Sequence, residues 1–321
     1  SLHGKSTENG LSSFQALATA IAAQVGTGNI VGASGAILTG GPGAIFWMWV
    51  IALLGSSTAF VEATLAQLHK EKDPLYGGYR GGPAYYIHHL FVKEGSKKKH
   101  SVIAVLFALS GLICWCGISQ VVGNSVSSAF ENAFHIPPLY TTIALVAVAA
   151  VIVLRKNATV KVLDFVVPIM AVCFFAMTIF ITIKNATLLP SVFKQIFTEA
   201  FGIRQVAAGG IGAVIMNGAK RGLFSNEAGS GSAPCAAAAA DIDHPAKEGL
   251  LQAFGVFIDT IVICSCTAMI MLLTPEKLTS GLEGMDLLQA SMQFHLGEFG
   301  VIFIAAILWL FSFSTFIGIL F

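Results

Sequence analysis

Long apolar stretches follow one another through most of this sequence, and they limit the folds that it can adopt. An α-helix needs about 20 consecutive apolar residues to cross the hydrocarbon core of a bilayer. Nine stretches reach or approach that length, at residues 14–38, 43–68, 101–130, 138–154, 160–184, 203–221, 223–240, 247–273 and 299–320. The sequence therefore predicts an all-α polytopic membrane protein, with residues 1–321 forming a single transmembrane bundle domain.

The composition supports a lipid environment and argues against several other classes of protein. Only 11% of the residues are charged and 55% are hydrophobic, whereas about a quarter of the residues of a soluble domain are charged. The net charge of +1 gives no reason to expect a nucleic-acid partner. Four of the six cysteines form C-x-C pairs inside apolar runs, which lack the spacing of a zinc site. We therefore expect neither a transition-metal site nor a bound cofactor.

The loops predict an orientation. Basic residues concentrate in the connection 69–100, in 155–161 and in 220–222, and loops rich in Lys and Arg face the cytoplasm. The stretch 184–204 should then lie outside, although it also carries three basic residues, and the polar stretch 275–298 should lie at the surface. The chain starts at Ser1 and stops inside an apolar run, so we expect the bundle to continue beyond both ends.

The first apolar stretch contains a group of poor helix formers. Gly26, Thr27, Gly28 and Asn29 follow one another at what should be mid-bilayer depth, and glycine in a helix interior costs about 1 kcal/mol relative to alanine. Local unwinding here would expose backbone amides for a carboxylate and carbonyls for Na⁺, as in the discontinuous helices of transporters. The alternative is a close helix crossing, since Gly28 and Gly32 form a G-x-x-x-G pattern.

A second interrupted segment lies about 180 residues later, at 207–212, where three glycines and two alanines occur together. Two interrupted helices, one in each half of a chain, point to the binding site of an inverted-repeat transporter. An ion channel would need a selectivity filter, and a membrane enzyme would need a nucleophile–base pair or a metal cluster. Neither pattern occurs, so we expect a transporter that is not an enzyme.

Several longer stretches resemble one known family. They are Val25-Gly-Thr-Gly-Asn-Ile30, Gly40-Gly-Pro-Gly-Ala-Ile-Phe-Trp-Met-Trp49, Gly81-Gly-Pro-Ala-Tyr-Tyr86, Lys220-Arg-Gly-Leu-Phe-Ser-Asn-Glu-Ala-Gly-Ser-Gly-Ser-Ala-Pro234, Asp259-Thr260 and Phe311-Ser-Phe-Ser-Thr315. With them, nearly the whole chain resembles the sodium:alanine (alanine or glycine:cation) symporter family of bacteria and archaea. The resemblance implies the five-plus-five inverted-repeat fold of the amino acid–polyamine–organocation superfamily, which includes the LeuT-like transporters, and transport by alternating access.

The resemblance also implies site residues. The substrate would be bound by Gln24, Gly26, Thr27, Gly28, Asn29, Gln120 and Thr315. The sequence departs from the family at two places: Gln24 stands where a small hydroxyl residue is common, and Ile319 stands near a common tryptophan. A longer polar side chain and a lost indole would change the volume of the pocket. The amino acid that is carried therefore stays open at this point.

Polar residues within the apolar stretches suggest an ion site and a gate. Asp259 lies inside a span, where a charge costs about 2.5–3.5 kcal/mol on insertion scales. Ser265 and Thr267 follow it and could bind Na⁺ together with the carbonyls of Gly26 and Thr27, or could instead hydrogen-bond back onto their own helix. Arg221 and Glu227 could form a gating or loop-fixing ion pair. The alternative is a helix that is capped by Ser225, with the carboxylate of Glu227 in its first turn.

Taken together, these features predict a multi-pass protein of the bacterial cytoplasmic membrane. We expect it to import a small neutral amino acid, alanine or glycine, coupled to Na⁺. Coupling to H⁺, or a different amino acid carried by the same fold, is the alternative. The expected partners are the amino acid, the coupling ion and the lipid bilayer.

Overall fold

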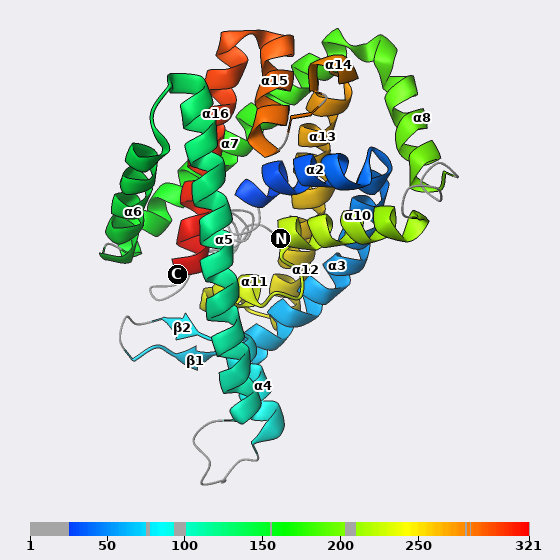
Figure 1. Ribbon diagram of the computed structural model, residues 1–321. Helices are drawn as coiled ribbons and strands as arrows, with labels where there is room; N and C mark the ends of the chain where they lie inside the picture. The colour runs from blue at the N-terminus through cyan, green and yellow to red at the C-terminus, as the bar shows by residue number, and fades with distance from the viewer. Residues whose placement is uncertain are drawn as a thin grey trace.

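The computed structural model describes residues 26–74, 78–92, 101–154, 156–202, 210–279, 281–282 and 284–320. Helices dominate it, and a short two-stranded sheet projects at one side beside α4 and α5 (Figure 1). The elements are α2 (Thr27–Gly40), α3 (Gly43–Leu68), β1 (Glu71–Lys72), β2 (Tyr79–Arg80), α4 (Pro83–Phe91), α5 (Val102–Phe134), α6 (Pro138–Leu154), α7 (Lys156–Lys184), η1 (Ala186–Leu188), α8 (Leu189–Ala200), α10 (Ile211–Asn226), α11 (Ser232–Ala239), α12 (Pro245–Val256), η2 (Phe257–Cys264), α13 (Ser265–Leu272), α14 (Glu276–Thr279), α15 (Gly284–Leu296) and α16 (Glu298–Leu320).

Four helical segments of the described residues are long and apolar enough to cross a membrane. They are Gly43–Leu68, Val102–Phe134, Pro245–Leu272 and Glu298–Phe316. A fifth crossing is possible if Ile169–Lys184 and Ala186–Ala200, which meet at 75°, are one bent span. Large apolar side chains lie exposed on the outside of α5, α6 and α7, as expected for helices that face lipid.

Most apolar stretches of the sequence correspond to one helix each. The predicted segment 43–68 coincides with α3, and the stretches at 138–154 and 299–320 coincide within a residue with α6 and α16. The predicted boundary between 203–221 and 223–240 is wrong, because α10 runs without interruption from Ile211 to Asn226. Residues 220–222 therefore lie inside a helix rather than in a loop. Leu223, Phe224 and Ser225 continue the helix at this point, and the chain turns only where Glu227 adopts a left-handed conformation.

Short helices and a hairpin occupy the polar connections. The connection after α3 contains the antiparallel pair β1–β2 and the helix α4. The polar stretch 275–298 contains α15, whose apolar face is buried through Met285, Leu288 and Met292. This stretch is thus not simply a surface loop, because α15 packs against α5 and α16 (Figure 1).

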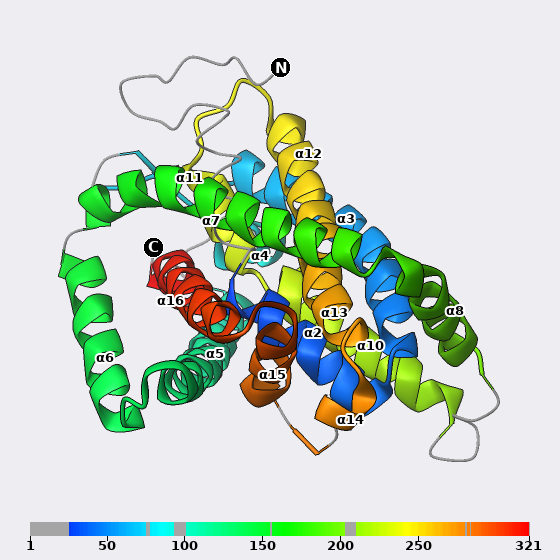
Figure 2. The same ribbon diagram turned by 90° about the horizontal axis from the view of Figure 1, so that it is seen from above.

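The central helices α2 and α10 lie side by side between α5 and α3 (Figures 1 and 2). Small residues allow this close approach. A Cβ at Gly28 would lie 3.2 Å from the carbonyl oxygen of Phe224, and one at Gly32 would lie 3.2 Å from that of Arg221. The G-x-x-x-G interpretation of Gly28 and Gly32 is therefore confirmed: this pair faces α10.

The largest apolar core lies among α5, α7, α13, α15 and α16, with Phe174 and Phe311 fully buried at its centre. At the opposite end, the last turn of α3 holds the end of α11. Gln67 Nε2 donates to the carbonyls of Ala237 and Ala240, and Lys70 Nζ donates to the carbonyl of Ala240 at 2.8 Å. A cation at the C-terminus of a helix also complements its dipole.

Candidate functional site

The N-terminus of α2 forms one wall of the site. Gly26 is extended (φ −146°, ψ −161°), and the helix begins at Thr27. The side chain of Asn29 stabilises this start, because its Oδ1 accepts a hydrogen bond from the Gly26 amide at 2.8 Å. The predicted interruption thus lies at Gly26, whereas Thr27, Gly28 and Asn29 form the first helical turn rather than unwound chain. Gln24 lies outside the described residues.

The second interruption separates α10 from α11. Glu227 is left-handed (φ 53°), and Gly229 and Gly231 also have positive φ. Asn226 Oδ1 accepts from the Ala228 amide at 3.1 Å, and Glu62 Oε2 on α3 accepts from the Gly229 amide at 2.9 Å. This break lies about 20 residues after the one predicted at 207–212. Residues 207–209 of that predicted segment lie outside the described residues.

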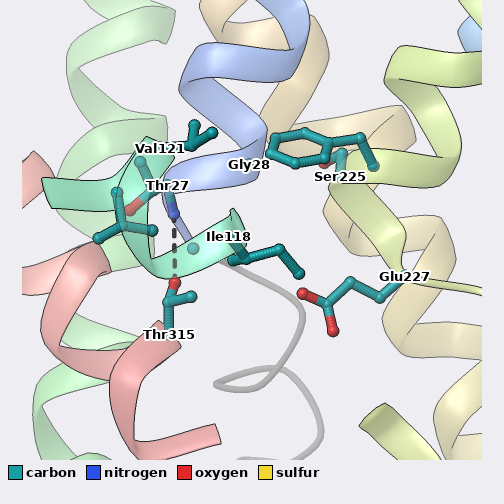
Figure 3. Close-up of a pocket in the computed structure, with 10 residues that line it drawn as sticks. Thr27, Gly28, Ile118, Val121, Ser225, Glu227 and Thr315 are labelled. Carbon is teal, nitrogen blue, oxygen red and sulfur yellow. Dashed lines mark hydrogen bonds between the residues drawn. The ribbon is translucent and has the colours of Figure 1, made fainter. Parts of the chain in front are cut away.

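A small pocket with a cavity volume of about 20 Å³ lies between these two interruptions (Figure 3). Its walls come from α2, α5, α10 and its C-cap, and α16, and its lining residues are Gly26, Thr27, Gly28, Ile118, Val121, Val122, Phe224, Ser225, Glu227 and Thr315. Four of the seven predicted substrate-binding residues, Gly26, Thr27, Gly28 and Thr315, are thus brought together here.

Hydroxyl groups of α16 close one side of this pocket. Thr27 Oγ1 lies 3.1 Å from Ser312 Oγ, and the Thr27 amide donates to Thr315 Oγ1 at 3.4 Å (Figure 3). A Cβ at Gly26 would overlap Thr315 Oγ1. Only glycine therefore fits at position 26 with Thr315 in its place, because no other residue lacks a Cβ.

Beside the pocket, a buried carboxylate joins the two interruptions. Asp259 has no exposed surface and lies in η2, the π-helical part of the span from Pro245 to Leu272. It accepts three hydrogen bonds, from Asn29 Nδ2 to Oδ1 at 2.6 Å and from Ser225 Oγ and Thr260 Oγ1 to Oδ2 at 2.9 Å each. π-Helical turns frequently occur at functional sites. The carboxylate therefore links the start of α2 to the end of α10.

The structure places other predicted residues away from the pocket. Gln120 is exposed on α5 and does not line it, because Ile118, Val121 and Val122 form the helix face that turns inward. Ser265 Oγ accepts from Trp49 Nε1 at 2.8 Å, and Thr267 Oγ1 bonds back to the carbonyl of Ile263. Gln120, Ser265 and Thr267 do not line the pocket, and their predicted roles stay predictions.

The predicted partners Arg221 and Glu227 do not form an ion pair among the described residues. The Arg221 guanidinium lies where a Cβ at Gly35 of α2 would be only 2.9 Å from its Cζ. Glu227 Oε2 instead accepts a short hydrogen bond from Ser232 Oγ, across the break. The capping alternative is wrong: Ser225 lies in the last turn of α10, and its hydroxyl bonds to Asp259.

Three hydroxyl residues of the site were not among the predicted site residues: Ser225, Thr260 and Ser312. Ser312 and Thr315 are three residues apart, which places them on one face of a helix. That spacing is a signal that the sequence contains. Ser225 and Thr260 both bond to Asp259. Ser225 is 34 residues away from Asp259 in the chain, so its contact depends on how α10 packs against η2.

Comparisons with known proteins agree with this architecture. The profile of the sodium:alanine symporter family matches residues 2–321. The probable sodium/glutamine symporter GlnT of Bacillus subtilis is 46% identical over 97% of this chain and 64% of its own length. The amino-acid carrier protein AlsT of the same organism is 44% identical over 96% and 64%, and the sodium/alanine symporter AgcS of Methanococcus maripaludis is 38% identical over 98% and 69%.

A solved structure shares the fold. A manganese transporter of Eremococcus coleocola, crystallised as the mutant H236A, superimposes with a TM-score of 0.54 at 12% identity, over 96% of this chain and 65% of that one. The chain spans 64% of the length of the two Bacillus subtilis relatives. Since the family profile covers almost every residue, this multi-pass membrane chain belongs to the sodium:alanine symporter family.

Proposed function

We propose that the protein containing this chain is a secondary active transporter that imports a small neutral amino acid, alanine or glycine, together with Na⁺. The observation that carries the proposal is the pocket between the two helix interruptions. Gly26, Thr27 and Gly28 line it from the start of α2, and the end of α10 lines it from the other side. Discontinuous helices of this kind bind substrate and ions near the bilayer midplane in inverted-repeat transporters.

The fold that we propose is the five-plus-five inverted repeat, with α2 and the α10–α11 pair as its two discontinuous helices. Transport then proceeds by alternating access around this fixed site. The bacterial relatives support a location in the cytoplasmic membrane, with the basic connection 69–100 on the cytoplasmic side.

For the coupling ion, we propose oxygens at the contact of α2 with α16. Na⁺ is a hard cation that prefers oxygen ligands. The hydroxyls of Thr27, Ser312 and Thr315 gather here beside the backbone of Gly26. This set keeps Gly26 and Thr27 from the sequence-based prediction, whereas Ser265 and Thr267 do not line the pocket.

A second candidate is glutamine transport with the same coupling. The relative named for sodium and glutamine is 46% identical to this chain, and the one named for sodium and alanine is 38% identical. Coupling to H⁺ is a further alternative, which two other relatives named as sodium/proton-dependent alanine carriers support.

One measurement tests these alternatives. The full-length protein is reconstituted in vesicles, and uptake of labelled alanine, glycine and glutamine is followed under an inward Na⁺ gradient, an inward H⁺ gradient or no gradient. We expect accumulation of alanine or glycine that requires the Na⁺ gradient. Uptake that is equal in all three conditions would contradict symport, and uptake of glutamine alone would establish the second candidate.

A further inference from the structure

A buried acidic side chain of α12 lacks a partner at one of its two oxygens. Glu248 lies in the first turn of α12 and exposes only 1% of its surface. Its Oε1 accepts from Gln252 Nε2 at 3.0 Å, whereas Oε2 has no hydrogen-bond partner among the described residues. A buried polar atom without a partner is rare in folded proteins, and it is especially unfavourable when the group is charged.

The fold of α12 does not require this carboxylate. The first turn of the helix is capped by His244, whose Nδ1 accepts from the Ala246 amide at 3.2 Å. The close contact with α3 is made by the residue after Glu248, because a Cβ at Gly249 would overlap Thr64 Oγ1. The side-chain hydrogen bond of Glu248 stays within its own helix. Neither the cap nor the packing of α12 therefore accounts for the buried charge.

A cation lies near Glu248, but it is engaged elsewhere. Lys70 Nζ donates to Gln67 Oε1 and to the carbonyl of Ala240, at 2.8 Å each. Burial lowers the pKa of Lys70 from its ordinary value, while the negative charges of Asp241 and Glu248 act in the opposite direction. The charges of Lys70 and Glu248 thus act on each other, although none of the ion pairs of the described residues involves Glu248.

Lys70 therefore has two alternative acceptors. The carbonyl of Ala240 belongs to the C-cap of α11, so the present hydrogen bond holds the end of α11 at the end of α3. The other acceptor is Oε2 of Glu248 on α12, the helix that follows α11, and α12 and α11 both pack against α3 (Figures 1 and 2). A lysine side chain is a flexible stem with three donors, so a change of rotamer moves it from one acceptor to the other.

We propose that Lys70 and Glu248 form a two-position latch at the ends of α3 and α11. In the docked state, which the structure shows, Lys70 holds Ala240 and Glu248 has no counter-charge. In the released state, α11 has moved away from α3, and Lys70 pairs with Glu248. The new ion pair offsets the loss of the hydrogen bond to Ala240, and the latch therefore makes the two states closer in free energy.

This inference rests on the proposed function, because alternating access moves one part of the bundle against another. It adds to that function the two residues that set the balance between the docked and the released state. They lie at the end of α3 and the start of α12, away from the residues that line the pocket.

Substitutions that remove one charge test the latch. Glu248→Gln keeps the shape but no longer attracts Lys70, and Lys70→Gln offers a neutral donor to Ala240 but no charge to Glu248. Gln67, which also holds Ala237 and Ala240, is present in both variants. Each variant should favour the docked state, and the double variant should behave as each single one does, because all three lack the same ion pair.

The separation of α3 and α11 is the quantity to measure. Spin labels are placed at Leu68 and Ala239 of the full-length protein, with the native cysteines replaced by alanine, and their distance is recorded with and without Na⁺ and alanine. The wild type should show a shorter and a longer distance. In each variant we expect the fraction with the longer distance, and the rate of Na⁺-driven uptake into vesicles, to fall about tenfold.

The melting temperature separates a latch from a structural carboxylate. Glu248→Gln removes an uncompensated buried charge from the docked state, so the latch predicts a higher melting temperature together with slower uptake. A carboxylate that stabilises the fold predicts a lower one. The matched control is Lys247→Gln, which removes the neighbouring charge. Lys247 is exposed and pairs with Asp243 at 3.0 Å, and exposed ion pairs contribute little, so all three measurements should match the wild type.

Four outcomes would overturn the latch. If Glu248→Gln stays within twofold of the wild type in the longer-distance fraction and in uptake, Lys70 and Glu248 do not set the balance. If it lowers the melting temperature and leaves the distances unchanged, Glu248 is structural. If the wild type accumulates alanine while showing a single distance, the latch fails and the proposed function stands. If the wild type accumulates no amino acid under any gradient, the proposed function fails and the latch fails with it.

Discussion

The side-chain nitrogen of Asn29 donates two hydrogen bonds to Asp259, 2.6 Å to Oδ1 and 3.0 Å to the backbone carbonyl oxygen. The other end of the same side chain accepts from the Gly26 amide. The buried side-chain amide of Asn29 therefore connects the start of α2 to the π-helical segment η2. Since Ser225 also bonds to Asp259, both helix interruptions share one carboxylate, and a movement of either interruption must rearrange its hydrogen bonds.

Asn29→Ala removes this tie, and we expect it to abolish uptake. It leaves Gly26 and Asp259 without their partner in a fully buried position, which should lower the free energy of unfolding by about 1–3 kcal/mol. Uptake into vesicles and the melting temperature in detergent check both effects. The matched control is Ser34→Ala on the same helix, whose hydroxyl bonds only to Ile30 and Val31 one turn back. Normal uptake by Asn29→Ala would show that the tie is dispensable.

The charge of Asp259 is tested by a pair of substitutions. Asp259→Asn keeps the shape but removes the negative charge, so we expect uptake to need about tenfold more Na⁺, equivalent to ~1.4 kcal/mol. Asp259→Ala also leaves the donors of Asn29, Ser225 and Thr260 unsatisfied and should lower the melting temperature more than Asp259→Asn does. An unchanged Na⁺ dependence in Asp259→Asn would limit the carboxylate to a structural role.

The close contact of α2 with α16 predicts a strong effect of one methyl group. In Gly26→Ala, the new Cβ would overlap Thr315 Oγ1, so we expect the contact to separate and uptake to be lost. Gly111→Ala on α5 is the control, because a Cβ there meets nothing within 4 Å. That substitution should leave uptake unchanged and stabilise the helix by up to about 1 kcal/mol. The pair is compared by uptake and by melting temperature, and equal behaviour would contradict the contact.

Much of the helical architecture could be predicted from residue type alone. The α3 segment is predominantly apolar, and proline and glycine mark its start, so its bounds were predicted as 43–68. The interruption at Gly26 was also predictable, since glycine, threonine and asparagine are together poor helix formers. In contrast, Leu223-Phe-Ser-Asn226 is compatible with a helix or with a turn. Its continuation to a left-handed Glu227 depends on partners such as Glu62, about 165 residues earlier in the chain.

The same reasoning explains which contacts of the predicted site residues could not be predicted. Ser265 and Thr267 have hydroxyls that suit Na⁺, but residue type does not reveal their contacts with Trp49 and Ile263. For Gln120, the uncertainty was which face of α5 turns inward. Ile118 and Val122, four residues apart, lie on that face. In a helix that is apolar on all sides, however, the sequence does not show which face turns toward the protein interior.

The last prediction concerns pH and the packing of α15. His295 Nε2 lies 3.0 Å from the carbonyl of Ile270 and 3.1 Å from Thr274 Oγ1, and its Nδ1 lies 3.5 Å from Asn185 Nδ2. Burial lowers the pKa of His295 below its ordinary value; the Ile270 carbonyl acts in the opposite direction, and the charge of Lys184 adds to the lowering. The folded protein therefore favours the neutral ring, which donates to Ile270 and accepts from Asn185.

Because the pKa is lower in the folded state, the unfolded chain binds a proton more readily in the range below its own pKa of about 6.5. The stability that His295 contributes is therefore present at neutral pH and is lost as the pH falls through and below that value. We expect the melting temperature of the wild type to drop between pH 7.5 and pH 5.5 by more than that of His295→Gln, which does not titrate. The difference between the two proteins is the quantity to measure, because it removes the pH dependence that they share. Equal drops in both would show that protonation of His295 does not loosen α15.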